Sequence, residues 1–315
     1  MWIIKHSIQR VHNLANEINT NSPLKVALLG LGKAGWKSDF DKGTIGKSHA
    51  YSIINQKTFI LVVGVDKDPK ALLEWKSRFD LPSEISIWRA LDSYAVDIVV
   101  ISTPIKTLFD YLKELVSKYP KILIIIEKPV VANLDEAHEL RRFMQSTKGN
   151  VLVNLPRLFA KETYELKSFV EMKLLKSIHG SYSGDFVNTG LHFISLLNFL
   201  FGKINLIKSD QEANPIIEIY QNSNFLGRIS HDPSIVTSSF DLVFNFEDTQ
   251  VNYFNGGEDI SLISKSGVQI LENTRALYQL NVYNYIAKNG FHKAIKLSGL
   301  EEISPSIFQM FGMIE

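Results

Sequence analysis

The chain contains no cysteine. This absence excludes disulfide bonds, thiolate metal ligands and thiol nucleophiles, and it is typical of a cytoplasmic protein, which we expect here. An excess of one charge is also lacking, since the formal net charge is only +1. A nucleic-acid-binding surface needs a strongly basic face, so we expect no nucleic-acid partner.

Long apolar runs are missing as well. The longest, such as residues 122–126, have the length of a strand. A membrane-spanning helix needs about 18 or more apolar residues, so no such helix and no membrane partner are expected. The first 21 residues also lack the apolar centre and small-residue cleavage site of a signal peptide.

The residues that are present suit a globular protein of two domains. The 315 residues are 45% hydrophobic and 21% charged, which is enough to bury a sizeable core. Apolar side chains recur at helical spacing near the start, and they predict an N-terminal helical extension over residues 1–23. This helix either docks on the domain that follows or forms an oligomer contact.

Residues 24–150 alternate short apolar runs with amphipathic helical patterns. Asp68 and Pro69 predict the start of one helix, and Asn133 with Glu136 predicts a capping box at another. Continuous apolar strands between helices indicate a parallel sheet covered on both faces, as in a doubly wound α/β domain. The predicted strands are 26–29, 60–65, 98–101, 122–126 and 151–153.

Residues 151–315 have the pattern of a second, α+β domain. Helices are predicted at 162–175 and 190–201, with a short one at 307–313. Turn residues separate a series of strand-like segments, which predict an open, mostly antiparallel sheet. These segments are 216–220, 225–229, 239–246, 251–254, 260–263, 268–271 and 278–283.

The first predicted strand runs directly into a Gly-x-Gly-x-x-Gly turn at residues 30–35. Here the first glycine allows a tight turn, the second lets backbone approach a pyrophosphate, and the third lets helix and strand pack closely. The helix N-terminus then faces the negative charge. The turn therefore predicts that this domain has the Rossmann fold. Its dinucleotide-binding residues are expected to be Gly30, Gly32, Lys33, Ala34 and Gly35.

Asp66 follows the second predicted strand. A carboxylate there accepts hydrogen bonds from the adenosine ribose and repels a 2′-phosphate, so NAD is favoured over NADP. The alternative is a helix-capping acid. The separation of Asp66 from the glycine turn is longer than the usual spacing of about 20 residues, which indicates an insertion at residues 36–47. That insertion is either a mobile flap over the cofactor or an inert surface loop.

Two motifs follow later strands, at the edge where ligands bind in open α/β sheets. Ser102, Thr103 and Pro104 leave room for the nicotinamide half of a cofactor, although turn chemistry alone also explains them. Glu127 and Lys128 come next, before Pro129, and both are also expected to contact the cofactor. An ammonium there can hold a substrate oxygen and stabilise its negative charge. The alternative is a solvated lysine.

His192 is the best acid–base candidate of the eight histidines, since imidazole exchanges protons near neutral pH. It lies early in an apolar helix, just after Asn188, and a structural role is the alternative. No group of residues has metal-ligand spacing, so we expect no metal.

From about residue 25 to 202 the chain resembles the Gfo/Idh/MocA family. The resemblance lies in four motifs and their order: the glycine turn, Ser-Thr-Pro, Glu-Lys-Pro and the Gly-x-His helix. The resemblance implies a Rossmann domain, an open antiparallel sheet, bound NAD or NADP, and homodimers or homotetramers built through that sheet. It places Lys128 and His192 at the catalytic positions, and Arg157 in the substrate-contacting region.

The chain departs from the family pattern at two positions. Asn188 stands where the family usually has aspartate, and Ser195 stands where it often does. Neither side chain can carry the negative charge of a carboxylate. The form of the motif is weakly similar to a subset found with bacterial surface-polysaccharide biosynthesis. We therefore expect an NAD-dependent oxidoreductase acting on a sugar, polyol or nucleotide sugar, with substrate-binding roles for Asn188 and Arg157. The alternative is a non-catalytic, nucleotide-binding sensor or scaffold.

Overall fold

The computed structural model describes residues 22–40, 45–202, 204–208, 215–234, 239–271 and 278–313. The helix predicted over residues 1–23 therefore lies almost entirely outside the described residues. The chain forms two compact units. The first consists of Met1–Pro156 and Leu277–Glu302, and the second of Arg157–Ala276 and Ile303–Glu315.

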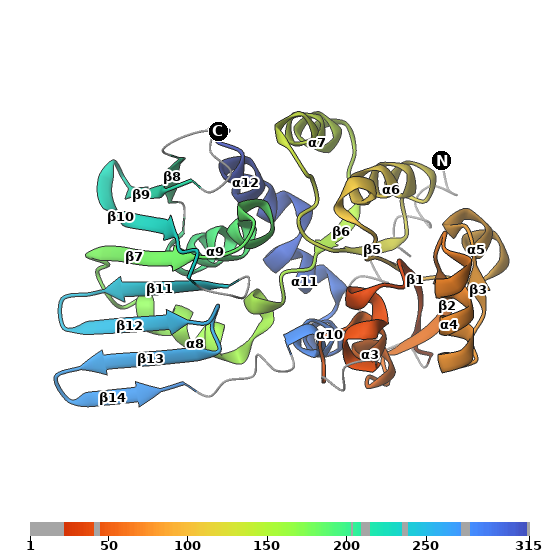
Figure 1. The fold of residues 1–315 in the computed structure, drawn as a ribbon, viewed down its shortest axis with the longest axis horizontal. Helices are drawn as coiled ribbons and strands as arrows, with labels where there is room; N and C mark the ends of the chain where they lie inside the picture. Colours follow the sequence, from red (N-terminus) through yellow and green to blue (C-terminus); the bar gives the residue numbers. More distant parts are fainter. Residues whose placement is uncertain are drawn as a thin grey trace, which may run out of the picture. The chain divides into compact units, whose positions relative to one another are not determined.

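The first unit contains a six-stranded parallel sheet with the order β3-β2-β1-β4-β5-β6 (Figure 1). β4 is buried along its whole length, as expected for a strand that is covered on both faces. This is the doubly wound order that the sequence predicts, and it brings the carboxyl ends of all the strands to one edge. The strands are β1 (Leu24–Leu29), β2 (Phe59–Val65), β3 (Ser83–Glu84), β4 (Ile98–Ile101), β5 (Leu123–Ile126) and β6 (Asn150–Val153).

The helices of this unit begin where the sequence provides caps. Asp68 caps α4 by accepting the N–H of Lys70 at 3.0 Å. At α7, Asn133 accepts the N–H of Glu136 at 2.9 Å. The Glu136 carboxylate reaches back to the N–H of Ala132, one residue before the N-cap, so the predicted Asn133 cap is confirmed and the reciprocal bond of the capping box is shifted by one residue. The helices are the π-helical turn η1 (Lys33–Lys37), α2 (Ser38–Phe40), α3 (His49–Ile54), α4 (Pro69–Phe79), α5 (Ile87–Ser93), α6 (Ile105–Lys118), α7 (Leu134–Ser146), α10 (Tyr278–Asn289) and α11 (Phe291–Ser298).

The strand predicted at residues 278–283 is wrong, because this segment is the start of α10. Its aromatic and β-branched side chains suit a strand, and Leu280 and Val282 fit an alternating pattern. The buried positions are instead Gln279, Val282, Tyr283 and Ile286, which have the i, i+3, i+4, i+7 spacing of a helix.

The second unit contains an eight-stranded sheet with the order β14-β13-β12-β11-β7-β10-β9-β8. Within this sheet, only the β10–β7 pair is parallel among the described strands, which confirms a mostly antiparallel sheet. Neither β7 nor β8 was predicted from the sequence. The strands are β7 (Ser177–Tyr182), β8 (Asn205–Lys208), β9 (Ile217–Gln221), β10 (Asn224–His231), β11 (Phe240–Asn245), β12 (Thr249–Phe254), β13 (Asp259–Ser264) and β14 (Gly267–Ile270).

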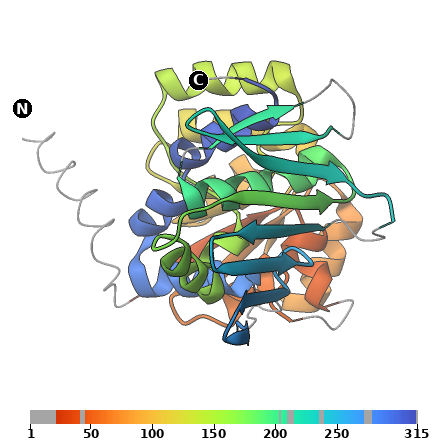
Figure 2. The same cartoon turned by 90° about the vertical axis from the view of Figure 1, so that its left-hand side faces the viewer.

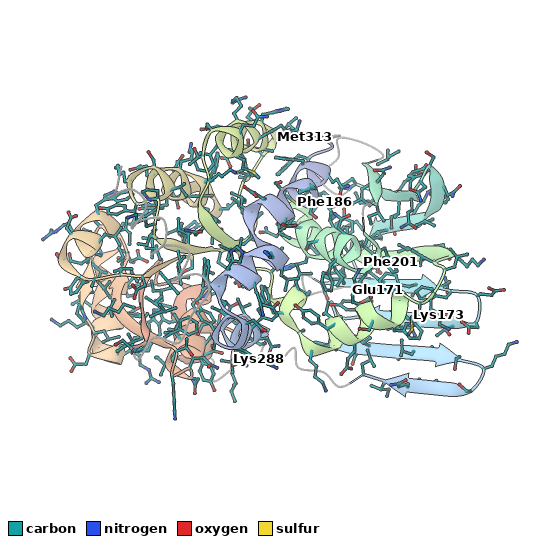
Figure 3. All side chains as sticks on the ribbon, turned by 180° about the vertical axis from the view of Figure 1, so that it is seen from behind. Glu171, Lys173, Phe186, Phe201, Lys288 and Met313 are labelled. Atoms are coloured by element: carbon teal, nitrogen blue, oxygen red, sulfur yellow. The ribbon has the colours of Figure 1, made fainter. Side chains whose placement is uncertain are left out.

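Helices lie against one face of this sheet, behind the strands in Figure 2. Fully buried aromatic side chains of β7, α9, β11 and β12 form the core beneath them. The predicted helix at 162–175 is shorter, and the one at 190–201 starts earlier, at Phe186 (Figure 3). The helical elements are the 3₁₀ turn η2 (Pro156–Phe159), α8 (Lys161–Val170), α9 (Phe186–Phe201) and α12 (Leu300–Met310), the last of which spans the boundary at residue 303.

Candidate functional site

The glycine turn lies at the carboxyl end of β1, against the end of β4. Gly30 has a φ of +97°, and a Cβ on it would lie 2.6 Å from the Ser102 carbonyl group. A Cβ on Gly35 would lie 2.3 Å from the Gly30 carbonyl oxygen. The protein's own packing therefore requires glycine at both positions.

Gly32 is different, because no described residue beyond its two chain neighbours has an atom within 4 Å of the place where its Cβ would be. Its φ of −87° is one that any residue adopts. Neither packing nor backbone conformation requires glycine here, and the residue is exposed. Open space above a bare backbone, at the start of the helical turn η1, fits a pyrophosphate that must approach closely. The residues present therefore fit a dinucleotide.

Asp66 follows β2 and holds the glycine turn. One carboxylate oxygen accepts the N–H of Leu31 at 2.8 Å, and the other accepts the N–H of Asp68 at 3.0 Å. The helix cap is Asp68 rather than Asp66, so the capping alternative for Asp66 is wrong. Each oxygen retains a second acceptor position, which a ribose hydroxyl can use.

Ser102, at the end of β4, ties the same turn from the other side. Its N–H donates to the Leu29 carbonyl at 2.8 Å, and its hydroxyl donates to the Gly30 carbonyl at 2.8 Å. Thr103 follows, with a buried hydroxyl that has no hydrogen-bond partner among the described residues. Pro104 is the N-cap residue of α6. The first two motifs predicted from sequence therefore meet at one edge of the sheet.

The third motif begins where β5 ends. The Glu127 N–H donates to the Ile101 carbonyl at 2.9 Å, which continues the sheet register by one residue. Lys128 is half-buried and precedes a cis peptide bond to Pro129. The Glu127 side chain accepts hydrogen bonds from His49, at 3.0 Å, and from Asn154, at 2.5 Å.

His49 and Asn154 were not among the residues predicted from the sequence. These residues come from α3 and from the end of β6, and two further partners, Gln279 and Tyr283, come from α10. Because the four lie far apart in the chain, no spacing rule connects them. The one available signal was a histidine directly after Ser48, which caps an apolar helix.

The segment predicted as an insertion, residues 36–47, is tied down where it is described. The buried Asp39 carboxylate accepts the N–H of Lys47 at 3.0 Å and the hydroxyl of Ser48 at 2.7 Å. Trp36 and Phe40 both pack edge-on against Phe79 of α4. These contacts do not favour a flap at the described ends, and residues 41–44 lie outside the described residues.

The second unit carries the remaining candidates. His192 is half-buried on α9, and Asn188 is exposed one turn earlier. Asp185 is the N-cap of α9 and accepts the Asn188 N–H at 2.9 Å. The buried Ser195 hydroxyl donates to the Leu191 carbonyl at 2.5 Å, a bond within the helix.

Arg157, at the start of the second unit, is held by its own domain. Its Nε donates to the Gly256 carbonyl at 2.8 Å, and its guanidinium carbon lies 5.2 Å from the centre of the Phe240 ring. The described residues contain no cluster of three or more metal-ligating side chains. Nor does any described helix have the length and apolar character needed to cross a membrane.

Residues 40–155 match the model of an oxidoreductase family with an NAD-binding Rossmann fold, Gfo/Idh/MocA. This match confirms the predicted resemblance, the Rossmann domain and the NAD-dependent oxidoreductase class. No curated protein matches the chain.

Solved structures share the fold of nearly the whole chain. The WlbA dehydrogenase from Chromobacterium violaceum, in complex with NADH and UDP-GlcNAcA, is 16% identical, with a TM-score of 0.69 and coverage of 93% of each chain. An inositol dehydrogenase homologue from Azotobacter vinelandii, complexed with NADH and myo-inositol, is 13% identical, with a TM-score of 0.70 and coverage of 93% of this chain and 95% of that one. At such identities the similarity establishes the fold.

Proposed function

Because residues 40–155 carry the NAD-binding Rossmann fold of the Gfo/Idh/MocA oxidoreductases, we propose that this protein transfers a hydride between NAD and a carbinol carbon of a sugar, polyol or nucleotide sugar. The observation that carries the proposal is the glycine turn. Gly30 and Gly35 are required by packing, whereas Gly32 leaves open space beside bare backbone.

In this proposal the first unit holds the cofactor. The backbone of Gly32, Lys33 and Ala34 binds the pyrophosphate, and Asp66 binds the adenosine ribose. The edge formed by residues 102–104 and Glu127 receives the nicotinamide half. When bound, NAD supplies the ring that accepts or donates the hydride.

The side chains supply proton transfer and charge stabilisation. His192 takes the proton from the substrate hydroxyl, or returns it in the reverse direction. Lys128 holds the same oxygen and stabilises its negative charge. Asn188 and Arg157 bind the substrate. The ligands of the two solved relatives, UDP-GlcNAcA and myo-inositol, support a substrate rich in hydroxyl groups.

A titration followed by a substrate screen tests the proposal. NADH binding is followed by fluorescence, and a panel of sugars, polyols and nucleotide sugars is then screened at the nicotinamide absorbance band. We expect saturable NADH binding and turnover with at least one class. Absence of NADH binding would contradict the proposed function.

One observation favours a second candidate, a sensor or scaffold that binds the nucleotide without turnover. Asn188 and Ser195 lack the carboxylates usual in the family, and the Ser195 hydroxyl is engaged within its own helix. NADH binding without turnover across the panel would favour this candidate. Activity that appears only in Asn188→Asp would identify a decayed enzyme.

Asp66→Asn should weaken discrimination between the two nicotinamide cofactors. The substitution removes the negative charge that repels a 2′-phosphate, so the ratio of NADPH to NADH affinity is expected to rise about tenfold, or about 1.4 kcal/mol. Asp66→Asn also disturbs the hydrogen bond from the Leu31 N–H and loosens the glycine turn. That loosening weakens both cofactors alike, so it does not change the ratio of their affinities. Parallel fluorescence titrations with both cofactors measure it, and an unchanged ratio would show that Asp66 does not face the ribose.

We also propose that the protein is cytoplasmic and that it forms homodimers or homotetramers. The contact between subunits would be made by the sheet of the second unit. The edge strand β14 exposes Val268 and Ile270, and such apolar edges are commonly covered by a partner. Sedimentation analysis of wild type and Ile270→Lys measures the assembly.

A further inference from the structure

A buried polar cluster surrounds Glu127, the residue before the proposed catalytic lysine. The His49 side chain is 0% exposed and that of Glu127 is 17% exposed. His49 Nε2 and Asn154 Nδ2 both contact the same carboxylate oxygen, Glu127 Oε1. A carboxylate taken out of water is stable only when such donors satisfy it.

The second nitrogen of His49 fixes which tautomer is present. Nδ1 lies 2.8 Å from the Tyr283 hydroxyl and 3.0 Å from Gln279 Nε2. Burial, together with the charge of Glu127, raises the pKa of Tyr283 well above its ordinary value, so the phenol keeps its proton and can donate it. With two donors at Nδ1, the imidazole proton lies on Nε2 and points at Glu127.

Glu127 therefore keeps its negative charge. Burial acts to raise the pKa of Glu127, but the hydrogen bonds from His49 and Asn154 and the charge of Lys128 hold it below its ordinary value of 4.5. His49, Lys128 and Tyr283 are the titratable groups that act on it. The backbone of Glu127 is also fixed, by the bond to Ile101.

We propose that His49 is a positioning residue, which with Asn154 holds Glu127 in place as a carboxylate, so that its negative charge favours the protonated form of the Lys128 ammonium next to it in the chain. The inference rests on the proposed role of Lys128 in catalysis. All the groups involved belong to the first unit. The residues that hold Glu127 beside Lys128 therefore all come from the Rossmann domain, on or next to α3, β5, β6 and α10.

Amine reactivity tests the link between Glu127 and Lys128 without any substrate. Trace acylation at a series of pH values, read by mass spectrometry, gives the midpoint at which each lysine becomes reactive. In Glu127→Gln the Lys128 midpoint should fall by about one pH unit, because an opposite charge has been removed. Lys113, which pairs with Glu139 at 2.7 Å on α7, is the internal control and should not move. An unchanged Lys128 midpoint in the folded variant would overturn the proposal.

The pH dependence of unfolding tests the link between His49 and Glu127. Since the pKa of Glu127 is lowered in the folded state, its contribution to stability is present above 4.5 and is lost as the pH falls through the folded value. The stability difference between wild type and Glu127→Gln should therefore shrink with falling pH. The same comparison in a His49→Leu background should weaken this trend, because Asn154 and Lys128 remain, whereas His49→Gln, whose amide can still donate to Glu127, should keep it.

An unaltered trend in the His49→Leu background would show that His49 does not hold Glu127. If His49→Leu does not fold, the Asn154→Leu background tests the other half of the proposal, since it removes the other donor to Glu127 and should weaken the trend in the same way. Neither readout requires turnover, so a failure here counts against the network alone. Unchanged turnover in Lys128→Ala would count against the proposed function alone.

Discussion

Gly32→Val is expected to lower the affinity for NADH at least about thirtyfold, or about 2 kcal/mol. The isopropyl group would occupy the space that a pyrophosphate needs beside the backbone. The substitution should leave the fold unchanged, because no described residue beyond the two chain neighbours lies within 4 Å of the Cβ position and φ is −87°. We expect the Tm to shift by no more than about 2 °C. NADH fluorescence titration and thermal unfolding measure the two effects.

The matched controls are the other two glycines of the turn. Gly30→Ala places a Cβ at a φ of +97° and 2.6 Å from the Ser102 carbonyl, and Gly35→Ala places one 2.3 Å from the Gly30 oxygen. Each should destabilise the protein by about 2–4 kcal/mol, through strain and forced backbone movement. Wild-type NADH affinity in Gly32→Val would mean that no ligand uses the space above that residue.

Lys128→Ala and His192→Ala should each lower kcat at least about a hundredfold, which is the usual loss when general acid–base catalysis is removed. NADH affinity should stay within about threefold of wild type, because neither side chain is proposed to hold the cofactor's phosphates or ribose. Steady-state kinetics with the substrate found in the screen, and NADH titration, separate the two quantities.

Exposed residues of the same types provide the controls for these two variants. Lys106 on α6 and His179 on β7 are both exposed, and their alanine variants should retain wild-type turnover. Turnover near the wild-type value in Lys128→Ala and His192→Ala would remove both residues from the mechanism.

The Rossmann core could be predicted because each of its signals is local in sequence. β4 and β5 are short, continuous runs of isoleucine with valine or leucine. Such runs are typical of parallel strands that are buried on both faces of a sheet. The glycine turn, the Asp68 cap and the capping box at Asn133 are equally local. Residue type and spacing over a few positions are enough to place them.

What could not be predicted depends on partners that are distant in the chain. β7 reads SIHGSY, which has little apolar character, yet it forms the middle of the second sheet because β10 and β11 pair with it on either side. α10 contains side chains typical of a strand but is helical, since its buried positions are set by packing within the first unit. The cluster around Glu127 draws on four elements, and only the fold brings them together.

The most direct test of the account is a crystal structure of the protein grown with excess NAD. We expect a diphosphate beside Gly32, contacted by the N–H groups at the start of η1, with the adenosine ribose on the Asp66 carboxylate. An empty glycine turn, or a dinucleotide bound elsewhere on the chain, would contradict it.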